Sequence, residues 1–145
     1  MKLARTMPRY VPLIATDMVR LAISLKQTSD TRELLEQYAI DSPALDVMEA
    51  LVQLDQADGA EDVQSRYANH MAKEPSVVAA RLWVAHEPLQ HESHRAALER
   101  ALDRAAQPLK RYRCAACGFE AQRHFWQCPG CQAWDSYPPR RVEEL

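Results

Sequence analysis

The sequence contains two C-x-x-C motifs, Cys114-Ala115-Ala116-Cys117 and Cys128-Pro129-Gly130-Cys131, with ten residues between them. A C-x-x-C turn lets two thiolates converge on one ion while nearby backbone N–H groups point at the sulfurs. Two such knuckles supply the four sulfurs of a closed tetrahedral site. Gly118 after the first knuckle allows a positive φ without steric cost. The sequence therefore predicts one tetrathiolate metal site with Cys114, Cys117, Cys128 and Cys131 as ligands.

Two other interpretations of the cysteines stay open, a pair of disulfides and a redox-active C-x-x-C. Disulfides need an oxidising compartment, which nothing in the sequence indicates. A thioredoxin-type motif needs one pair on a βαβ scaffold, whereas this chain has two pairs and no such pattern. Zinc and iron both accept four thiolates, so the spacing does not choose between them. Because the protein fills all four positions, we expect no hydrolytic metal catalysis and no enzyme.

The segment that carries the cysteines is about 35 residues long, too short to fold by burial alone. We expect the ion to contribute its folding free energy, on the order of 10 kcal/mol. The segment is also rich in aromatic residues. We expect four of them to form its small core or to dock it on the preceding helices: Phe119, Phe125, Trp126 and Trp134.

The composition is that of a folded globular protein. Of 145 residues, 47% are hydrophobic and 26% are charged, which excludes wholesale disorder. The net charge of −2 gives no general attraction to nucleic acid or acidic lipid, and three glycines are too few for a phosphate-binding loop. The most apolar N-terminal run, residues 13–25, carries Asp17 and Arg20 and is too short to span a membrane. With no signal peptide pattern either, we expect this chain alone to be soluble.

The part before the cysteines has the apolar periodicity of helices throughout. Pro12, Pro43 and Pro75 each stand near the start of every second expected helix, 31 and 32 residues apart. This period is typical of tandem helical hairpins. We therefore expect a mainly α fold, an α-solenoid of tetratricopeptide-like hairpins in residues 1–107 followed by a small metal ribbon in residues 108–145, which the resemblance described below implies to be rubredoxin-like. A compact helical bundle is the alternative.

Two helix starts have recognisable signals. Ser42 followed by Pro43 predicts an N-cap and first turn. Ser93 predicts the N-cap of the last helix, with four of its residues facing inward: Ala97, Leu98, Ala101 and Leu102.

The C-terminal motif also resembles known proteins. The stretch from Tyr112 to Phe119, Tyr-Arg-Cys-x-x-Cys-Gly-Phe, is followed by Trp126-x-Cys-Pro-x-Cys-x-Ala-Trp ending at Trp134. This pair is similar to the knuckles of rubredoxin, with a shorter gap and with Gln132 where the second knuckle usually has glycine. After helical repeats, it resembles the C-terminal part of the lipopolysaccharide assembly protein B family.

The resemblance implies a scaffold without catalytic residues. That family has an N-terminal membrane anchor, a cytoplasmic tetratricopeptide array and a rubredoxin-like domain, and this chain would lack the anchor and the earlier repeats. The implied role is that of an adaptor at the cytoplasmic face of the bacterial inner membrane. It couples the membrane AAA+ protease FtsH to turnover of the deacetylase that commits carbon to lipid A. The implied partners are these two proteins, and the implied metal in the four-cysteine site is iron, with zinc as the alternative.

Two rival functions follow from the same residues. A tetrathiolate iron that changes valence would make the chain a redox or iron sensor. Zinc ribbons with basic rims bind nucleic acid, and residues 110–145 carry a net charge of +2 against −4 for residues 1–109. Because the helical part is acidic, we expect no nucleic acid partner. A partner protein or anionic lipid suits the basic group better: Lys110, Arg111, Arg113, Arg123, Arg140 and Arg141.

Overall fold

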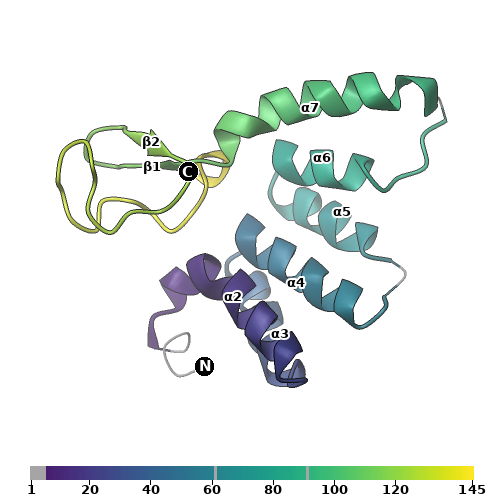
Figure 1. Ribbon diagram of the computed structural model, residues 1–145, viewed down its shortest axis with the longest axis horizontal. Coiled ribbons are helices and arrows are strands. Elements are labelled where there is room, and N and C mark those ends of the chain that lie inside the picture. Colours follow the sequence, from purple (N-terminus) through teal and green to yellow (C-terminus); the bar gives the residue numbers. More distant parts are fainter. Residues whose placement is uncertain (1–5, 61, 91) are drawn as a thin grey trace. The chain divides into compact units, whose positions relative to one another are not determined.

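The computed structural model describes residues 6–60, 62–90 and 92–145, which are mainly helical with a small C-terminal ribbon. The chain divides into two compact units, Met1–Pro75 and Ser76–Leu145. Figure 1 labels the helices and strands of both units.

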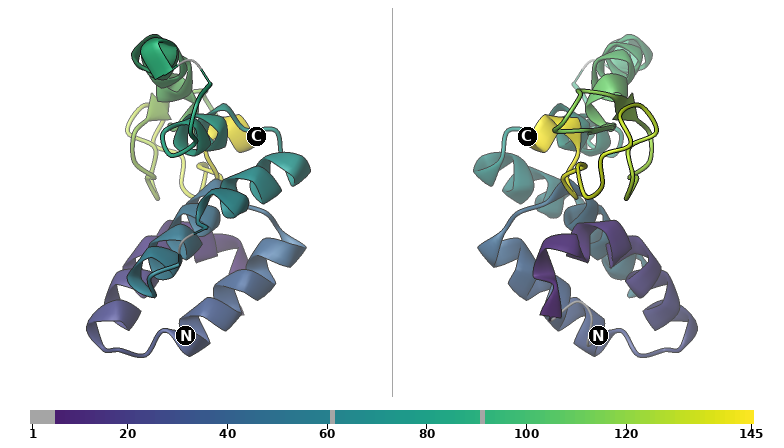
Figure 2. Two further views of the ribbon diagram at one scale, coloured as in Figure 1. Left: turned by 90° about the vertical axis from the view of Figure 1, so that its right-hand side faces the viewer. Right: turned by 90° about the vertical axis from the view of Figure 1, so that its left-hand side faces the viewer.

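The first unit is built around one central helix. Its elements are η1 (Pro8–Tyr10), α2 (Val11–Ser24), α3 (Ser29–Asp41), α4 (Leu45–Ala57) and α5 (Gln64–Lys73). Helix α4 packs against α2, α3 and α5, and the views in Figures 1 and 2 show α2 and α4 side by side. The core lies mainly between α2 and α4 and includes Val11, Ala15, Val19, Leu35, Val47, Leu51 and Leu54. Helix α4 is the second helix after α2, and contact between such a pair is typical of tandem helical hairpins.

A charged cluster ties three helices of this unit together. Asp55 on α4 accepts hydrogen bonds from Arg66 on α5 and, at 2.5 Å, from Arg32 on α3. Arg66 also bonds Glu36 of α3 at 3.2 Å. Burial would raise the pKa of Asp55, but the hydrogen bonds from the two guanidinium groups outweigh it and lower that pKa. Asp55 is therefore held as a carboxylate although it is buried.

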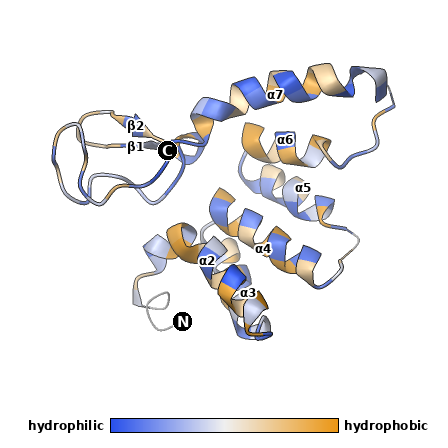
Figure 3. Cartoon of the chain, in the orientation of Figure 1, coloured by the Kyte–Doolittle hydropathy of each residue, from blue (hydrophilic) through white to orange (hydrophobic). Residues whose placement is uncertain are grey.

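The second unit contains one helical hairpin and the ribbon. Its elements are α6 (Val77–Val84), η2 (Glu92–His94), α7 (Arg95–Leu109), β1 (Tyr112–Arg113), β2 (Glu120–Ala121) and η3 (Val142–Glu144). Helices α6 and α7 pack together, with an ion pair between Arg81 and Asp103 at 2.6 Å. Arg95 at the start of α7 also donates to the Val84 carbonyl at 2.7 Å. Figure 3 shows hydrophilic and hydrophobic residues alternating in bands along α7.

These observations confirm the expected fold class of helical hairpins followed by a small ribbon. The three prolines stand at the second residue of α2 and two residues before α4 and α6, as the period predicts. Helix α7 continues to Leu109, and the division into 1–107 and 108–145, drawn from composition, stays a prediction. None of the helices within the described ranges is both long and apolar enough to cross a bilayer.

The predicted N-cap at Ser42 is wrong. Helix α3 runs to Asp41, Ser42 closes it, and α4 begins only at Leu45 after extended Ala44. Ala44 and Leu45 are both buried in the core. Reaching that position requires the chain to stay extended past Pro43, so burial overrides the local capping signal.

The predicted start and inner face of the last helix are also wrong. Ser93 lies in the η2 turn, and α7 begins at Arg95 without a side-chain cap. Of the residues expected to face inward, Leu102 is half-buried and the others are exposed: Ala97, Leu98 and Ala101. The covered positions recur at helical spacing and are instead Arg95, Glu99, Leu102, Ala106 and Leu109. The buried face of α7 is therefore rotated about the helix axis relative to the predicted face.

Candidate metal centre

The ribbon brings the four predicted cysteine ligands together. Their sulfur atoms all lie within 4.8 Å of one another. Two pairs cross between the knuckles, with Sγ–Sγ distances of 3.8 Å for Cys114 and Cys131 and 3.7 Å for Cys117 and Cys128. Each knuckle therefore contributes two sulfurs to one cluster.

The two knuckles have the same backbone geometry. The N–H of Gly118 donates to the Cys114 carbonyl at 2.8 Å, and the N–H of Gln132 donates to the Cys128 carbonyl at 2.8 Å. Both donors have positive φ, 77° at Gly118 and 62° at Gln132. Glycine adopts this conformation freely, whereas a residue with a Cβ is strained there. The prediction for Gly118 is confirmed, and Gln132 bears the strain that glycine would avoid.

Backbone N–H groups point at the inner sulfur of each knuckle. Those of Ala116 and Cys117 approach the Cys114 sulfur, and those of Gly130 and Cys131 approach the Cys128 sulfur. The Cys114 sulfur also lies 3.3 Å from the Ser136 hydroxyl. This side chain, with the backbone donors, lowers the pKa of the Cys114 thiol to about 6.

The outer thiol of the first knuckle titrates in the opposite direction. A backbone hydrogen bond from Phe119 favours the Cys117 thiolate, but the neighbouring thiol of Cys131, burial and the other two cysteines raise its pKa to about 12. Four sulfurs this close cannot all carry negative charge without a cation among them. The donor set thus has the electrostatics of a cation site.

A buried tyrosine that no sequence pattern predicted supports the cluster. Tyr137 is 1% exposed, and its hydroxyl donates to the Phe119 carbonyl at 3.2 Å and lies 4.0 Å from the Cys128 sulfur. Burial raises the pKa of Tyr137 to about 12, so it stays a neutral donor. The ring of His124 packs edge-on against Tyr137 and Tyr112. Tyr137 lies six residues beyond the last cysteine, where no local pattern marks it as part of the core.

The expected aromatic core of the ribbon is largely wrong. Phe119 is 44% exposed, Trp126 54% and Trp134 71%, and of the four predicted aromatics Phe125 alone is half-buried. The buried aromatic residues are instead Tyr112 and Tyr137. For Trp134 the backbone gives a reason, because this residue pairs with Gln127 in an isolated bridge at the surface of the second knuckle.

Most of the basic group near the ribbon is engaged within the unit. Strand β1 pairs with β2 so that Arg113 faces Glu120, and the two side chains bond at 2.8 Å. Arg111 approaches the same carboxylate at 3.5 Å. Arg141 stacks over the Tyr112 ring and donates to the Lys110 carbonyl. These cations stabilise the ribbon's own structure.

The C-terminal turn η3 joins the ribbon to helix α6. One oxygen of Glu143 accepts from the backbone N–H groups of Val77 and Val78, and the other accepts from the Ser76 hydroxyl at 2.8 Å. The Val142 N–H donates to the Arg111 carbonyl at 2.7 Å. The turn therefore bonds the start of the ribbon and the start of α6 at the same time.

The donor set fits one tetrahedral metal ion. A tetrahedron with metal–sulfur bonds of about 2.3 Å has sulfur–sulfur edges of about 3.8 Å. The observed 3.7 and 3.8 Å agree with this value, and a disulfide bond is about 2.05 Å long. All four cysteines are free. The four cysteines can therefore hold one metal ion, and the disulfide interpretation of the sequence is wrong.

Comparison with known proteins gives the same result for the ribbon. Residues 112–139 match the family described as "Rubredoxin metal binding domain". Over 123 residues, the chain is 26% identical to a protein of Escherichia coli (strain K12), and the match covers 81% of this chain and 32% of the relative. A relative from Haemophilus influenzae is 25% identical over 96 residues, which are 63% of this chain and 24% of the relative. Both relatives have the same name.

The chain is similar to lipopolysaccharide assembly protein B. This finding confirms the resemblance to the C-terminal part of that protein. The chain spans about a third of the length of the Escherichia coli lipopolysaccharide assembly protein B, 32%. The match extends beyond the ribbon, because 123 aligned residues must include most of the helices.

Proposed function

We propose that this chain is part of a non-enzymatic adaptor that regulates lipopolysaccharide synthesis. The adaptor couples the deacetylase that commits carbon to lipid A to proteolysis by the membrane protease FtsH. The observation that carries the proposal is the similarity to lipopolysaccharide assembly protein B across 81% of the chain, helices included. The chain works at the cytoplasmic face of the inner membrane, and its partners are the protease and the deacetylase.

The closed four-cysteine cluster supports a role without catalysis. Four protein sulfurs complete a tetrahedron, which leaves no position for water or substrate on the ion. Cys114, Cys117, Cys128 and Cys131 serve as ligands, and the ion holds the ribbon in shape. By resemblance to the family the ion is iron, with zinc as the alternative. Elemental analysis and a visible spectrum of protein purified without chelator distinguish them, since thiolate-bound ferric iron absorbs visible light and zinc does not.

The adaptor role is tested in cells that make the whole protein. Its gene is placed under a repressible promoter, and the half-life of the deacetylase is followed by immunoblot after protein synthesis is stopped. We expect depletion to lengthen the half-life, and restored expression to shorten it again. An unchanged half-life after full depletion contradicts the adaptor role.

A further inference from the structure

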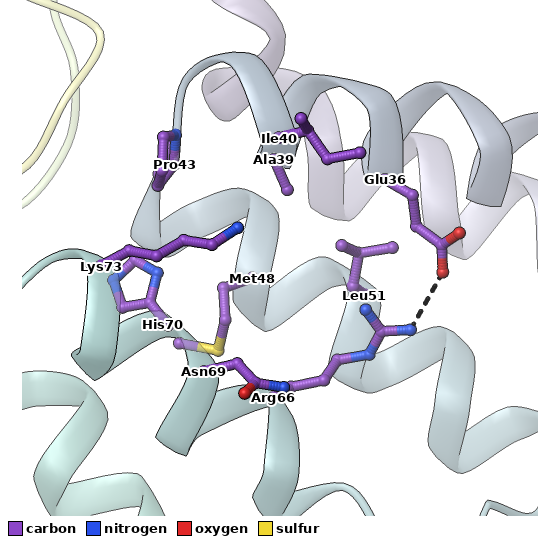
Figure 4. A pocket seen from close by; sticks show the side chains of 11 residues that line it. Glu36, Ala39, Ile40, Pro43, Met48, Leu51, Arg66, Asn69, His70 and Lys73 are labelled. Atoms are coloured by element: carbon purple, nitrogen blue, oxygen red, sulfur yellow. Dashed lines mark hydrogen bonds and ion pairs between the residues drawn. The ribbon is translucent and has the colours of Figure 1, made fainter.

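The first unit has a pocket that the metal centre does not involve. It measures about 310 Å³, at the lower end of the 300–1,000 Å³ typical of ligand sites. Three helices line it, as Figure 4 shows: the end of α3, the first half of α4 and the last two turns of α5. The volume suits one or two side chains of an extended peptide and is too small for a helix, whose diameter is about 10–12 Å.

The pocket has one apolar wall and one polar wall. Met48 and Leu51 of α4 form the apolar floor, and Ile40 of α3, which is 67% exposed, stands at its edge. Arg66, Asn69, His70 and Lys73 form the polar wall, because their spacing places them on one face of α5. A ligand that fits both walls has an apolar side chain beside a polar or charged group.

The charges of the polar wall determine which charge the polar group of the ligand should carry. Arg66 is neutralised by Asp55 and Glu36. Lys73 makes no ion pair with any described residue, and Figure 4 shows its side chain extending from α5 with the ammonium group on the pocket side. The exposed amide of Asn69 adds a second donor. One carboxylate is the group that complements an ammonium and an amide at this position.

The charge of the surrounding unit limits the ligand further. Residues 6–75 carry more acidic than basic side chains, twelve against six. A run of acidic residues would be repelled by this excess, whereas a single carboxylate beside Lys73 would not. From these observations we infer that the pocket binds an extended peptide segment in which a large apolar residue is next to a single carboxylate. The inference deepens the proposed function and rests on it, because it describes the segment of a partner that the adaptor would hold.

The test uses the full chain and a fluorescent peptide, acetyl-Gly-Ser-Leu-Asp-Ser-Gly-amide, in fluorescence anisotropy at low salt. Two further peptides replace the Asp with Asn or the Leu with Ser. The variants Lys73→Gln and Ile40→Ser alter the pocket. Their matched controls, Lys26→Gln and Leu21→Ser, alter exposed residues of the same unit away from it.

We expect saturable binding of the Leu-Asp peptide, weakened about three- to fivefold by Lys73→Gln and about as much by replacing its Asp with Asn. The two changes together should weaken binding no further, because both remove the same contact. Ile40→Ser should weaken binding about fivefold, and the controls should not change it. No binding at 1 mM peptide, equal affinity for the Asp and Asn peptides, or equal effects of pocket and control variants would each overturn the inference. Circular dichroism verifies that the variants fold.

The outcome separates this pocket from the adaptor role. Suppose that depletion of the protein lengthens the half-life of the deacetylase, and that expression of either pocket variant shortens it fully again. The adaptor role then stands, and the pocket assignment is wrong. If the peptide binds as described but depletion leaves the half-life unchanged, the pocket stands and the adaptor role is wrong.

Discussion

Replacing Glu143 with alanine removes the carboxylate that joins the C-terminal turn to helix α6. In the native chain this carboxylate accepts hydrogen bonds from the backbone N–H groups of Val77 and Val78 and from the Ser76 hydroxyl. These N–H groups belong to the first turn of α6, where a helix has no backbone acceptors of its own. We therefore expect Glu143→Ala to loosen the start of α6.

The size of the effect follows from the contacts. Loss of a helix-capping acceptor costs about 0.5–2 kcal/mol, and a hydrogen bond to a charged group contributes about 1.5–3 kcal/mol. Ser76 continues to cap the helix in the variant, because its hydroxyl accepts from the Ala79 N–H at 2.8 Å. The bond to the Val77 N–H is exposed, so water replaces part of it. We expect a local loss of about 1.5 kcal/mol, which corresponds to roughly a tenfold change in an opening equilibrium.

Amide hydrogen exchange measures this opening directly. In Glu143→Ala, the amides of Val77 and Val78 should exchange about tenfold faster, while those of β1 and α2 should not change. Glu143→Gln keeps an acceptor without the charge and should show a smaller increase. Glu33→Ala, at an exposed position in the first unit, is the matched control and should have no effect on α6. Unchanged exchange at Val77 and Val78 in Glu143→Ala would show that the turn does not hold the helix.

Three further perturbations test the ribbon and the first unit. Removing the metal with a strong chelator should unfold residues 112–139 and leave most of the far-ultraviolet helical signal. Elemental analysis verifies that the metal is gone. A native amide spectrum of the metal-free ribbon would contradict the prediction. Gln132→Gly should stabilise the metal-loaded ribbon by about 1 kcal/mol, and Gly118→Ala should destabilise it by a similar amount, because φ is positive at both positions. Chemical denaturation measures both changes. A ribbon destabilised by Gln132→Gly and stabilised by Gly118→Ala would refute the strain argument. Asp55→Asn should destabilise the first unit by about 2–3 kcal/mol in urea, because Arg32 and Arg66 lose their shared partner. Since these guanidinium groups lower the folded-state pKa of Asp55 despite its burial, that stabilisation is complete above about pH 4 and declines as the pH falls through the lowered pKa; identical acid slopes for the native chain and Asp55→Asn would argue against it.

The sequence predicts those features of the ribbon that depend on local backbone geometry. The spacing within each C-x-x-C motif limits how far apart two sulfurs can lie, and the glycine at 118 marks a positive φ. The period of the prolines likewise depends on the length of one helical hairpin, so the alternation of helices was predictable.

The features that the sequence does not predict depend on contacts between residues distant in the chain. Ser42 and Pro43 form a good capping pair by themselves, but burial of Ala44 and Leu45 in the core sets the start of α4. Hydrophobicity alone favours Trp134 as a core residue, yet the pairing of its backbone with Gln127 leaves it at the surface. The sequence also does not mark Glu143 as a cap, because the helix that it caps, α6, lies 65 residues earlier in the chain.

The two cysteines of each knuckle differ in their exposure to solvent. Cys117 and Cys131 are exposed, whereas Cys114 and Cys128 are buried. Alkylating agents and peroxide therefore meet one sulfur of each knuckle first. An ion attacked in this way would lose its two outer bonds while the inner pair still held it. The outer pair would then govern how long the ion stays bound. After oxidation by peroxide, the inner pair would set where the ion rebinds once the outer sulfurs are reduced again.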